Sequence, residues 1–161
     1  DVGPHVYGHV QRVALAARAA VEGLTGVRAS LKWPNDLLVD GRKLAGVLAQ
    51  SGVRDGVIDH VVVGIGINAV VSDAAMVGGG VHPLDLLERV LLEYDRLPDD
   101  LHEEYRRHLA TLGQRVRVER PGGEVVGRAT DVEADGRLVV VDECAITHRI
   151  DTGDVIHLRP A

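Results

Sequence analysis

The segment LKWPNDLLVDGRKLAGVLAQ (residues 31–50) holds the only two lysines of the chain, Lys32 and Lys43, among 18 lysines and arginines in total. Arginine presents a rigid planar fork, whereas lysine presents a compact and mobile point charge. Lysine would suit a site in which a carboxylate reacts to become a phosphoryl ester, because its mobile ammonium group can stay close to the reacting oxygens. The alternative is that both lysines are solvated strand-edge residues that discourage aggregation. The scarcity of lysine elsewhere favours a site.

The residues after Lys32 predict a turn that presents polar groups. Pro34 pushes the preceding Trp33 toward an extended conformation, so Lys32 and Trp33 should end a strand. Asn35 and Asp36 should then occupy the turn. Turns on a rigid sheet are places where polar side chains can reach into a cleft.

Lys43 is predicted to lie in a β-hairpin close to that turn. Asp40-Gly41 is a strong two-residue hairpin signal between two apolar runs, and Lys43 begins the second strand. Strict alternation of side chains would place Lys43 and Gly46 on opposite faces of this strand. A bulge or a strand end is therefore needed if both residues serve one site.

The segment GIGIN (residues 64–68) is the second candidate. In a strand, Gly64, Gly66 and Asn68 share one face, and Ile65 and Ile67 share the other. The first face is a bare backbone platform that suits a flat ring. The alternative is that the two glycines make room for a packed helix. A dinucleotide fingerprint is not supported, because a third glycine and a helix start are missing.

No metal site is predicted. Asp131, Glu133 and Asp135 imitate the start of a calcium loop, but strands flank them and Asp142 stands where the loop needs glutamate. Asp135-Gly136 is instead interpreted as a hairpin turn.

Hydrophobic periodicity predicts an α+β domain over residues 1–112 and a small all-β domain over residues 113–161. A first helix should end near Gly26, and strands should follow it. A second helix should begin at Pro83 and bury one of its faces, and a short third helix should begin near Pro98. The buried face of the Pro83 helix is expected to hold Leu84, Leu87, Leu91 and Tyr94. Residues 72–81 are expected to form a loop. Short β-rich segments after Gly113 suggest a small barrel.

The composition indicates which classes of binding partner and which cellular compartment to expect. The net charge of −6 and the pI near 5.7 argue against nucleic acid as a partner. No apolar run or signal peptide points to a membrane or to secretion. The single cysteine, Cys144, suits the reducing cytoplasm and is expected in a strand core. Because residue 1 is Asp, we expect the chain to be a piece of a longer protein.

The motifs KWPND, RKLAGVL and GIGIN, in this order, resemble those of the bacterial biotin–protein ligases (biotin–acetyl-CoA-carboxylase ligases). The ending GRATDVEADGRLVVV…DTGDVIHLRP is similar to the SH3-like C-terminal domain of that family. The resemblance covers essentially the whole chain. It implies a class II synthetase-like fold, a mixed or antiparallel sheet packed by helices, followed by the SH3-like β-barrel.

The resemblance implies a reaction in two steps. In the first step, the carboxylate of biotin attacks the α-phosphate of ATP to give biotinyl-5′-AMP, and Mg²⁺ enters the site bound to ATP. In the second step, a lysine of a biotin carboxyl carrier protein takes the biotin. Lys43 matches the family's functional lysine near the biotin carboxylate. The resemblance further implies that Lys43, Gly46, Val47 and Leu48 bind biotin and that the adenylate is bound by Lys32, Asn35, Asp36, Gly64, Gly66 and Asn68.

Several points stay open at this stage. In the family a biotin loop rich in glycine and arginine precedes the region matched here, so residues 1–161 alone are expected to bind biotin weakly and to form no detectable adenylate. The alternatives are a lipoate or octanoyl transferase of the same fold and a non-catalytic docking module. The sequence leaves the oligomeric state open, a homodimer included.

Overall fold

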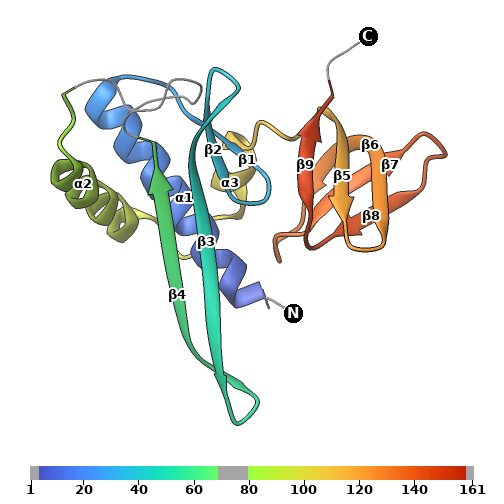
Figure 1. Ribbon diagram of the computed structural model, residues 1–161, viewed down its shortest axis with the longest axis horizontal. Helices are drawn as coiled ribbons and strands as arrows, with labels where there is room; N and C mark the ends of the chain where they lie inside the picture. Colours follow the sequence, from blue (N-terminus) through green and yellow to red (C-terminus); the bar gives the residue numbers. More distant parts are fainter. Residues whose placement is uncertain (1–3, 69–79, 159–161) are drawn as a thin grey trace.

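The computed structural model describes residues 4–68 and 80–158, with side chains from Val6 onward. The first part of the chain forms α1 (Pro4–Thr25), β1 (Ser30–Lys32), β2 (Asp36–Val39), β3 (Arg42–Arg54), β4 (Val57–Ile67), α2 (Pro83–Arg96) and α3 (His102–His108). The second part forms β5 (Arg115–Arg120), β6 (Gly123–Val132), β7 (Leu138–Asp142), β8 (Thr147–Ile150) and β9 (Asp154–His157). The predicted α+β organisation is confirmed (Figure 1).

An antiparallel sheet in the order β1-β2-β3-β4 carries α1 on one face (Figure 1). Leu31, Leu37, Ala45 and Ile67 lie directly opposite one another across the four strands and belong to the core under α1. The other half of this core is the apolar stripe of α1, which recurs at helical spacing and includes Val10, Ala14, Ala17 and Val21. The helix ends where predicted, because Gly26 adopts a left-handed φ of 70° beyond its last turn.

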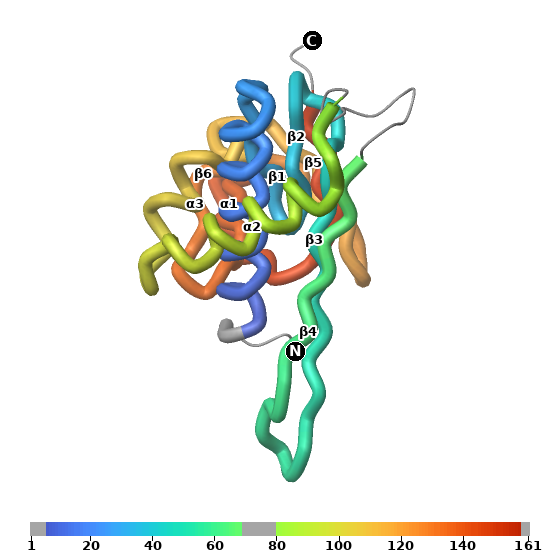
Figure 2. Tube along the Cα trace, turned by 90° about the vertical axis from the view of Figure 1, so that its left-hand side faces the viewer, coloured from blue at the N-terminus to red at the C-terminus, as the bar shows by residue number. Residues whose placement is uncertain are grey.

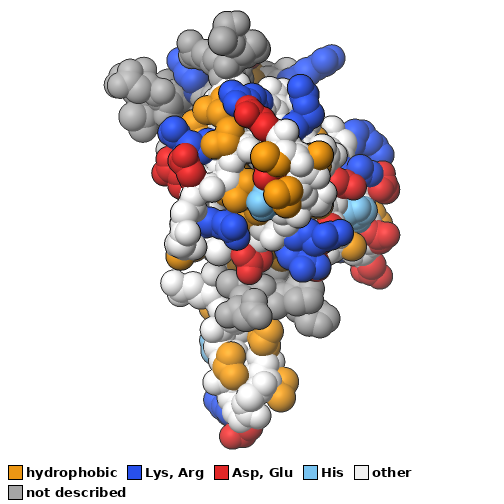
Figure 3. Space-filling view, turned by 90° about the vertical axis from the view of Figure 1, so that its right-hand side faces the viewer, with side chains coloured by type: hydrophobic (Ala, Val, Ile, Leu, Met, Phe, Trp, Pro, Cys, Tyr) orange, Lys and Arg blue, Asp and Glu red, His pale blue; other side chains and the backbone are white. Residues whose placement is uncertain are grey.

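Two tight turns shape the hairpins of this sheet. Asp40 and Gly41 have φ values of 49° and 72°, as a two-residue turn with both central residues left-handed requires, so the predicted hairpin is confirmed. Asp55 and Gly56 make a similar turn between β3 and β4. The β3–β4 hairpin projects well beyond the rest of the molecule (Figure 2). Hydrophobic side chains lie exposed on this projection (Figure 3), among them Val53, Val57 and Val62.

The second part of the chain is a five-stranded antiparallel sheet in the order β8-β7-β6-β5-β9. Its buried side chains are aliphatic, as the near absence of aromatic residues requires, and include Val116, Val118, Leu138, Val140 and Ile150. Strand β9 lies on the side of this sheet that faces the helical part of the molecule (Figure 1). The boundary at residue 112 and the SH3-like character of this sheet stay predictions.

Two predictions about burial were wrong. Leu84, Leu87 and Leu91 of α2 are 66%, 53% and 57% exposed, whereas Val90 is buried. The helix carries apolar residues on two sides, and its spacing cannot tell which side meets α1. Cys144 is exposed in the turn between β7 and β8 instead of lying in a strand core, and its N–H donates to Asp142 Oδ1 at 2.9 Å.

Two further points concern the limits of the described ranges. The loop predicted over residues 72–81 falls almost entirely outside them. Within residues 4–68 and 80–158, every helix is too short or too polar to cross a lipid bilayer.

Candidate functional site

Four of the residues singled out in the sequence form one row across the sheet. Lys32 pairs with Asp36, Asp36 with Gly46 and Gly46 with Gly66, so one residue of each strand belongs to the row. Directly paired residues of neighbouring strands point to the same side of a sheet. Because the adjoining row faces α1, this one lies on the opposite, open face.

A β-bulge brings Lys43 to the same face. Leu38 pairs with Lys43 and Leu37 pairs with Ala45, so that Leu44 is an extra residue in β3. The extra residue reverses the alternation between Lys43 and the residues that follow it. The bulge that the sequence required is therefore present.

Lys43 and Asp36 form a close ion pair above Gly46. The distance from Lys43 Nζ to Asp36 Oδ1 is 2.6 Å. A Cβ atom on Gly46 would lie 3.2 Å from Lys43 Nζ and 3.4 Å from Asp36 Oδ1. The absence of a side chain at Gly46 thus leaves the room in which the ammonium group and the carboxylate meet.

The glycine platform predicted on β4 is open. A Cβ atom on Gly66 would meet no described atom within 4 Å, and one on Gly64 would lie 3.9 Å from the carbonyl oxygen of Leu48. The Leu48 side chain, directly opposite Gly64, is 64% exposed. No helix of the described ranges packs on these glycines. The intervening Ile65 belongs to the core on the other face.

Asn35 and Asn68 hold the backbone on either side of the bulge. Asn35 Nδ2 donates to the carbonyl oxygen of Val47 at 2.7 Å, and the N–H of Val47 donates to the carbonyl oxygen of Asn35 at 2.8 Å. Asn68 donates through its N–H to Leu44 O at 2.8 Å and through Nδ2 to Lys43 O at 3.2 Å. Both side-chain amides therefore fix the backbone that carries Lys43 and Gly46.

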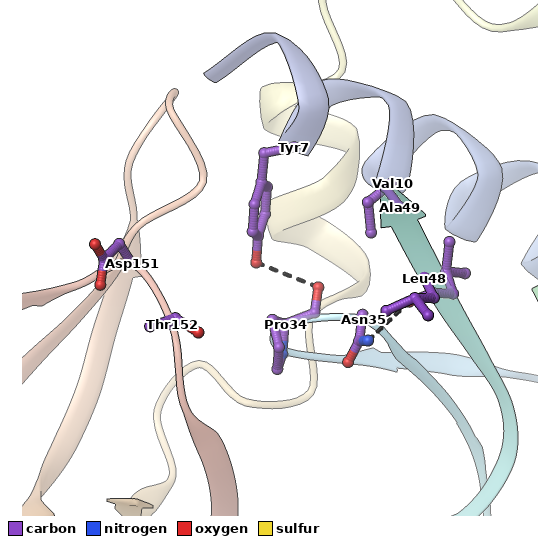
Figure 4. Close-up of a pocket in the computed structure, with 9 residues that line it drawn as sticks. Tyr7, Val10, Pro34, Asn35, Leu48, Ala49, Asp151 and Thr152 are labelled. Atoms are coloured by element: carbon purple, nitrogen blue, oxygen red, sulfur yellow. Dashed lines mark hydrogen bonds between the residues drawn. The ribbon is translucent and has the colours of Figure 1, made fainter. Parts of the chain in front are cut away.

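Two tyrosines that sequence reasoning missed anchor the turn between β1 and β2. The hydroxyl group of Tyr7 donates to the carbonyl oxygen of Pro34 at 3.2 Å (Figure 4). The hydroxyl group of Tyr105 donates to the same oxygen at 3.3 Å. Burial raises the pKa of both tyrosines, so both phenols stay protonated and can donate. Trp33 is fully buried, and its Nε1–H donates to the carbonyl oxygen of Gly136 at 2.8 Å. No local spacing in the sequence signalled these contacts.

A pocket of about 620 Å³ borders the open face. Its walls come from Tyr7 of α1, the Pro34–Asn35 turn, Val47 and Leu48 of β3, and the Asp151–Thr152 turn that precedes β9 (Figure 4). Of the predicted biotin-binding residues, the structure brings Val47 and Leu48 to this pocket. Lys43 and Gly46 do not line this pocket and lie on the open face of the sheet. The side chain of Val47 is buried on the α1 side, so it offers mainly its backbone.

Lys32 has a partner that the sequence did not indicate. Its Nζ lies 3.8 Å from Asp154 Oδ1 at the start of β9. The row of site candidates therefore ends against the C-terminal sheet. In the part of the chain that the structure describes, no group of three or more histidine, cysteine, aspartate or glutamate residues could hold a metal ion.

The fit at Gly46 leads to a testable expectation. Replacing Gly46 by alanine should push the flexible end of Lys43 away from Asp36 while the fold stays intact. A reaction that depends on this ammonium group should slow about tenfold, less than the 10²-fold that a misplacement of about 1 Å can cost. The measurement is the rate of adenylate formation together with the melting temperature.

Gly8→Ala is the matched control for this substitution, because a Cβ atom there would meet no described atom within 4 Å and Gly8 lies in α1. It should leave the rate unchanged. An unchanged rate in Gly46→Ala as well would mean that the position of Lys43 is not critical.

Comparison with known proteins gives the family. Residues 2–68 match the model of the biotin/lipoate A/B protein ligase family, and residues 111–158 match that of the biotin protein ligase C-terminal domain. A biotin–acetyl-CoA-carboxylase ligase of Mycobacterium tuberculosis is 34% identical over 181 residues, an alignment that covers 99% of this chain and 66% of that relative. The chain thus spans slightly less than two thirds of that relative's length.

Solved structures show the same fold. The apo biotin protein ligase of Aquifex aeolicus superposes with a TM-score of 0.79 at 20% identity, over 95% of this chain and 76% of that one. The complex of the Aquifex aeolicus enzyme with biotin and ATP gives a TM-score of 0.70 at 21% identity, over 96% of this chain and 72% of that one. The segment that matches the ligase model contains Lys43, and the segment that matches the C-terminal-domain model follows it in the chain. The chain therefore belongs to the biotin protein ligase family.

Proposed function

We propose that the chain carries the adenylate-forming face of a biotin–protein ligase. The observation that carries the proposal is the convergence of Lys43 and Asp36 over Gly46, next to the open platform of Gly64 and Gly66. A flat ligand can approach this backbone closely, and a cation stands at its edge. The names of the relatives support biotin and ATP as the substrates.

In the proposed first step, a carboxylate oxygen of biotin attacks the α-phosphorus of ATP, a bond to this oxygen forms, and pyrophosphate leaves. Negative charge builds up on the phosphoryl oxygens in the transition state. Lys43 would stabilise this charge, because an ammonium group already held in position needs no reorganisation. Asp36 would hold Lys43 between turnovers and would release it to the phosphoryl group.

Biotin would lie over Gly46 and Leu48, where Val47 contributes backbone only. The adenylate would extend over Gly64 and Gly66 toward Asn68. Asn35 would act through the backbone of Val47, and Lys32 would lie at the far end of the row. Mg²⁺ would be held chiefly by the phosphates of ATP, as is usual for this ion.

In the proposed second step, the amine of an acceptor lysine attacks the acyl carbon of biotinyl-5′-AMP, an amide bond forms, and AMP leaves. The Mycobacterium tuberculosis relative is named for acetyl-CoA carboxylase, so the biotin carboxyl carrier of such a carboxylase is the proposed acceptor. Location in the cytoplasm and a homodimer stay predictions. Sedimentation analysis of the purified protein would test the homodimer.

The deciding experiment uses the longest natural form of the protein that contains residues 1–161. Calorimetry should show binding of biotin and of ATP, and labelled biotin should be converted to an adenylate. Lipoate serves as the competing substrate, because the matched family includes lipoate ligases. Conversion of lipoate in preference to biotin would replace the proposal by a lipoate ligase, and binding of none of the ligands would favour a docking module.

A further inference from the structure

One buried hydroxyl group links the turn after β1 to the C-terminal sheet. Thr111 is fully buried, and its Oγ1 accepts the N–H of Trp33 at 3.0 Å. The same oxygen lies 3.3 Å from Nε2 of His157, which is in β9. Thr111 therefore lies between the segment that leads to Asn35 and Asp36 and the imidazole of His157.

The hydrogen-bond pattern favours a neutral imidazole with its proton on Nδ1. Both contacts of Thr111 Oγ1 use its full capacity when the oxygen accepts from Trp33 and the hydroxyl donates to unprotonated Nε2 of His157, the partner within reach among the described residues. If His157 took up a proton, Nε2 would become a donor. The hydroxyl proton of Thr111 would then lack this acceptor inside the protein, which costs free energy.

The charges around His157 act in the same direction. Burial, and secondly the positive charge of Lys32, lower the pKa of His157. Lys32 from β1 is paired with Asp154 of β9, and the residue opposite His157 on β5 is the apolar Val116. A second positive charge on His157 would repel Lys32, which begins the row of site candidates.

We propose that Thr111 is a positioning residue for the turn from Trp33 to Asp36, and that neutral His157 keeps it in place while protonated His157 loosens it. Acid would then weaken nucleotide binding through the C-terminal sheet. The predicted change in nucleotide binding rests on the proposed function. The positioning of the Trp33–Asp36 turn by Thr111 does not. The hold should weaken as the pH falls from about 6.5, the ordinary histidine pKa, through the lowered pKa of His157.

Trp33 reports on the turn directly, because it is the only tryptophan of the chain. We expect its fluorescence emission to shift to the red between about pH 7.5 and about pH 4.5, a range that extends well below the ordinary histidine pKa because the pKa of His157 is lowered. In His157→Gln, which cannot titrate, this shift should disappear. Thr111→Val should show the loosened emission at both pH values, and Thr111→Ser, which keeps the hydroxyl, should restore the wild-type response.

His148→Gln is the matched control. His148 lies in β8 at the opposite edge of the same sheet, and its Nε2 is 2.8 Å from Asp142 Oδ2, so it is a histidine of this sheet that does not contact the turn. This variant should keep the wild-type shift of Trp33. If His157→Gln keeps the shift as well, or if the wild type shows none, the proposal is overturned. This comparison does not depend on whether Thr111→Val folds.

Calorimetry with ATP at the two pH values separates this inference from the proposed function. ATP affinity should fall about five- to tenfold at the lower pH in the wild type, within the usual range of coupling between two sites, and should stay constant in His157→Gln. Absence of ATP binding at both pH values, with a Trp33 shift that still depends on His157, would reject the proposed function and leave the hold on the turn established. ATP binding with the same pH dependence in His157→Gln would reject the positioning role.

Discussion

Lys43→Ala should slow adenylate formation about 10²–10³-fold, the loss expected when one group that stabilises transition-state charge is removed. Lys43 Nζ is held 2.6 Å from Asp36 Oδ1 by the bulge and by the space above Gly46. Because its side chain is 56% exposed, the substitution should hardly change the melting temperature. The measurement is pyrophosphate release with biotin and ATP in the longest natural form of the protein.

Two variants sharpen this test. Lys43→Arg should restore only part of the rate, because the planar guanidinium cannot sit as a compact charge in the space above Gly46. Arg42→Ala removes the neighbouring exposed cation of the same strand and should leave the rate unchanged. A rate for Lys43→Ala within tenfold of the wild type would exclude Lys43 as the phosphoryl-stabilising group.

Gly66→Val should lower the affinity for ATP about 10- to 100-fold. The reason is that a steric clash between the new side chain and the bound nucleotide should cost about 1–3 kcal/mol of binding free energy. The new side chain meets no described atom within 4 Å, and valine favours strands, so the protein should stay folded. Calorimetry measures the affinity, and a melting curve measures the stability. Gly66→Ala should fall between the wild type and Gly66→Val.

Ile65→Val is the complementary control, since Ile65 lies on the core side of the same strand. It should lower the stability and leave ATP affinity unchanged, the reverse of the Gly66→Val pattern. If Gly66→Val unfolds the protein, or leaves ATP affinity intact, the platform does not bind the nucleotide.

The sequence by itself determined the local elements and the identity of the candidates. The 3.6-residue period predicted α1, the Asp40-Gly41 pair predicted the hairpin, and Pro83 marked the start of α2, because each of these signals acts over a few neighbouring residues. Residue types and spacing also singled out Lys43 and the glycines of β4. These properties need no knowledge of which strands are neighbours.

Only the tertiary structure decided how the candidates meet. The period of two placed Lys43 and Gly46 on opposite faces, and the bulge at Leu44, which depends on pairing with β2, placed them together. Likewise, only the register of the four strands aligns Lys32, Asp36, Gly46 and Gly66.

Contacts between distant segments were equally invisible in the sequence. Gly136 was predicted as a turn residue, yet its carbonyl oxygen also accepts the indole N–H of Trp33, 103 positions away. Thr111 belongs to none of the motifs quoted from the sequence, and nothing in the ending DTGDVIHLRP singled out its His157. The side of α2 that meets α1 also depended on packing, because that helix is apolar on two sides. Such choices depend on the surfaces that the folded chain brings together. The physical reason is that periodicity shows which residues share a face but not which partner will bury that face.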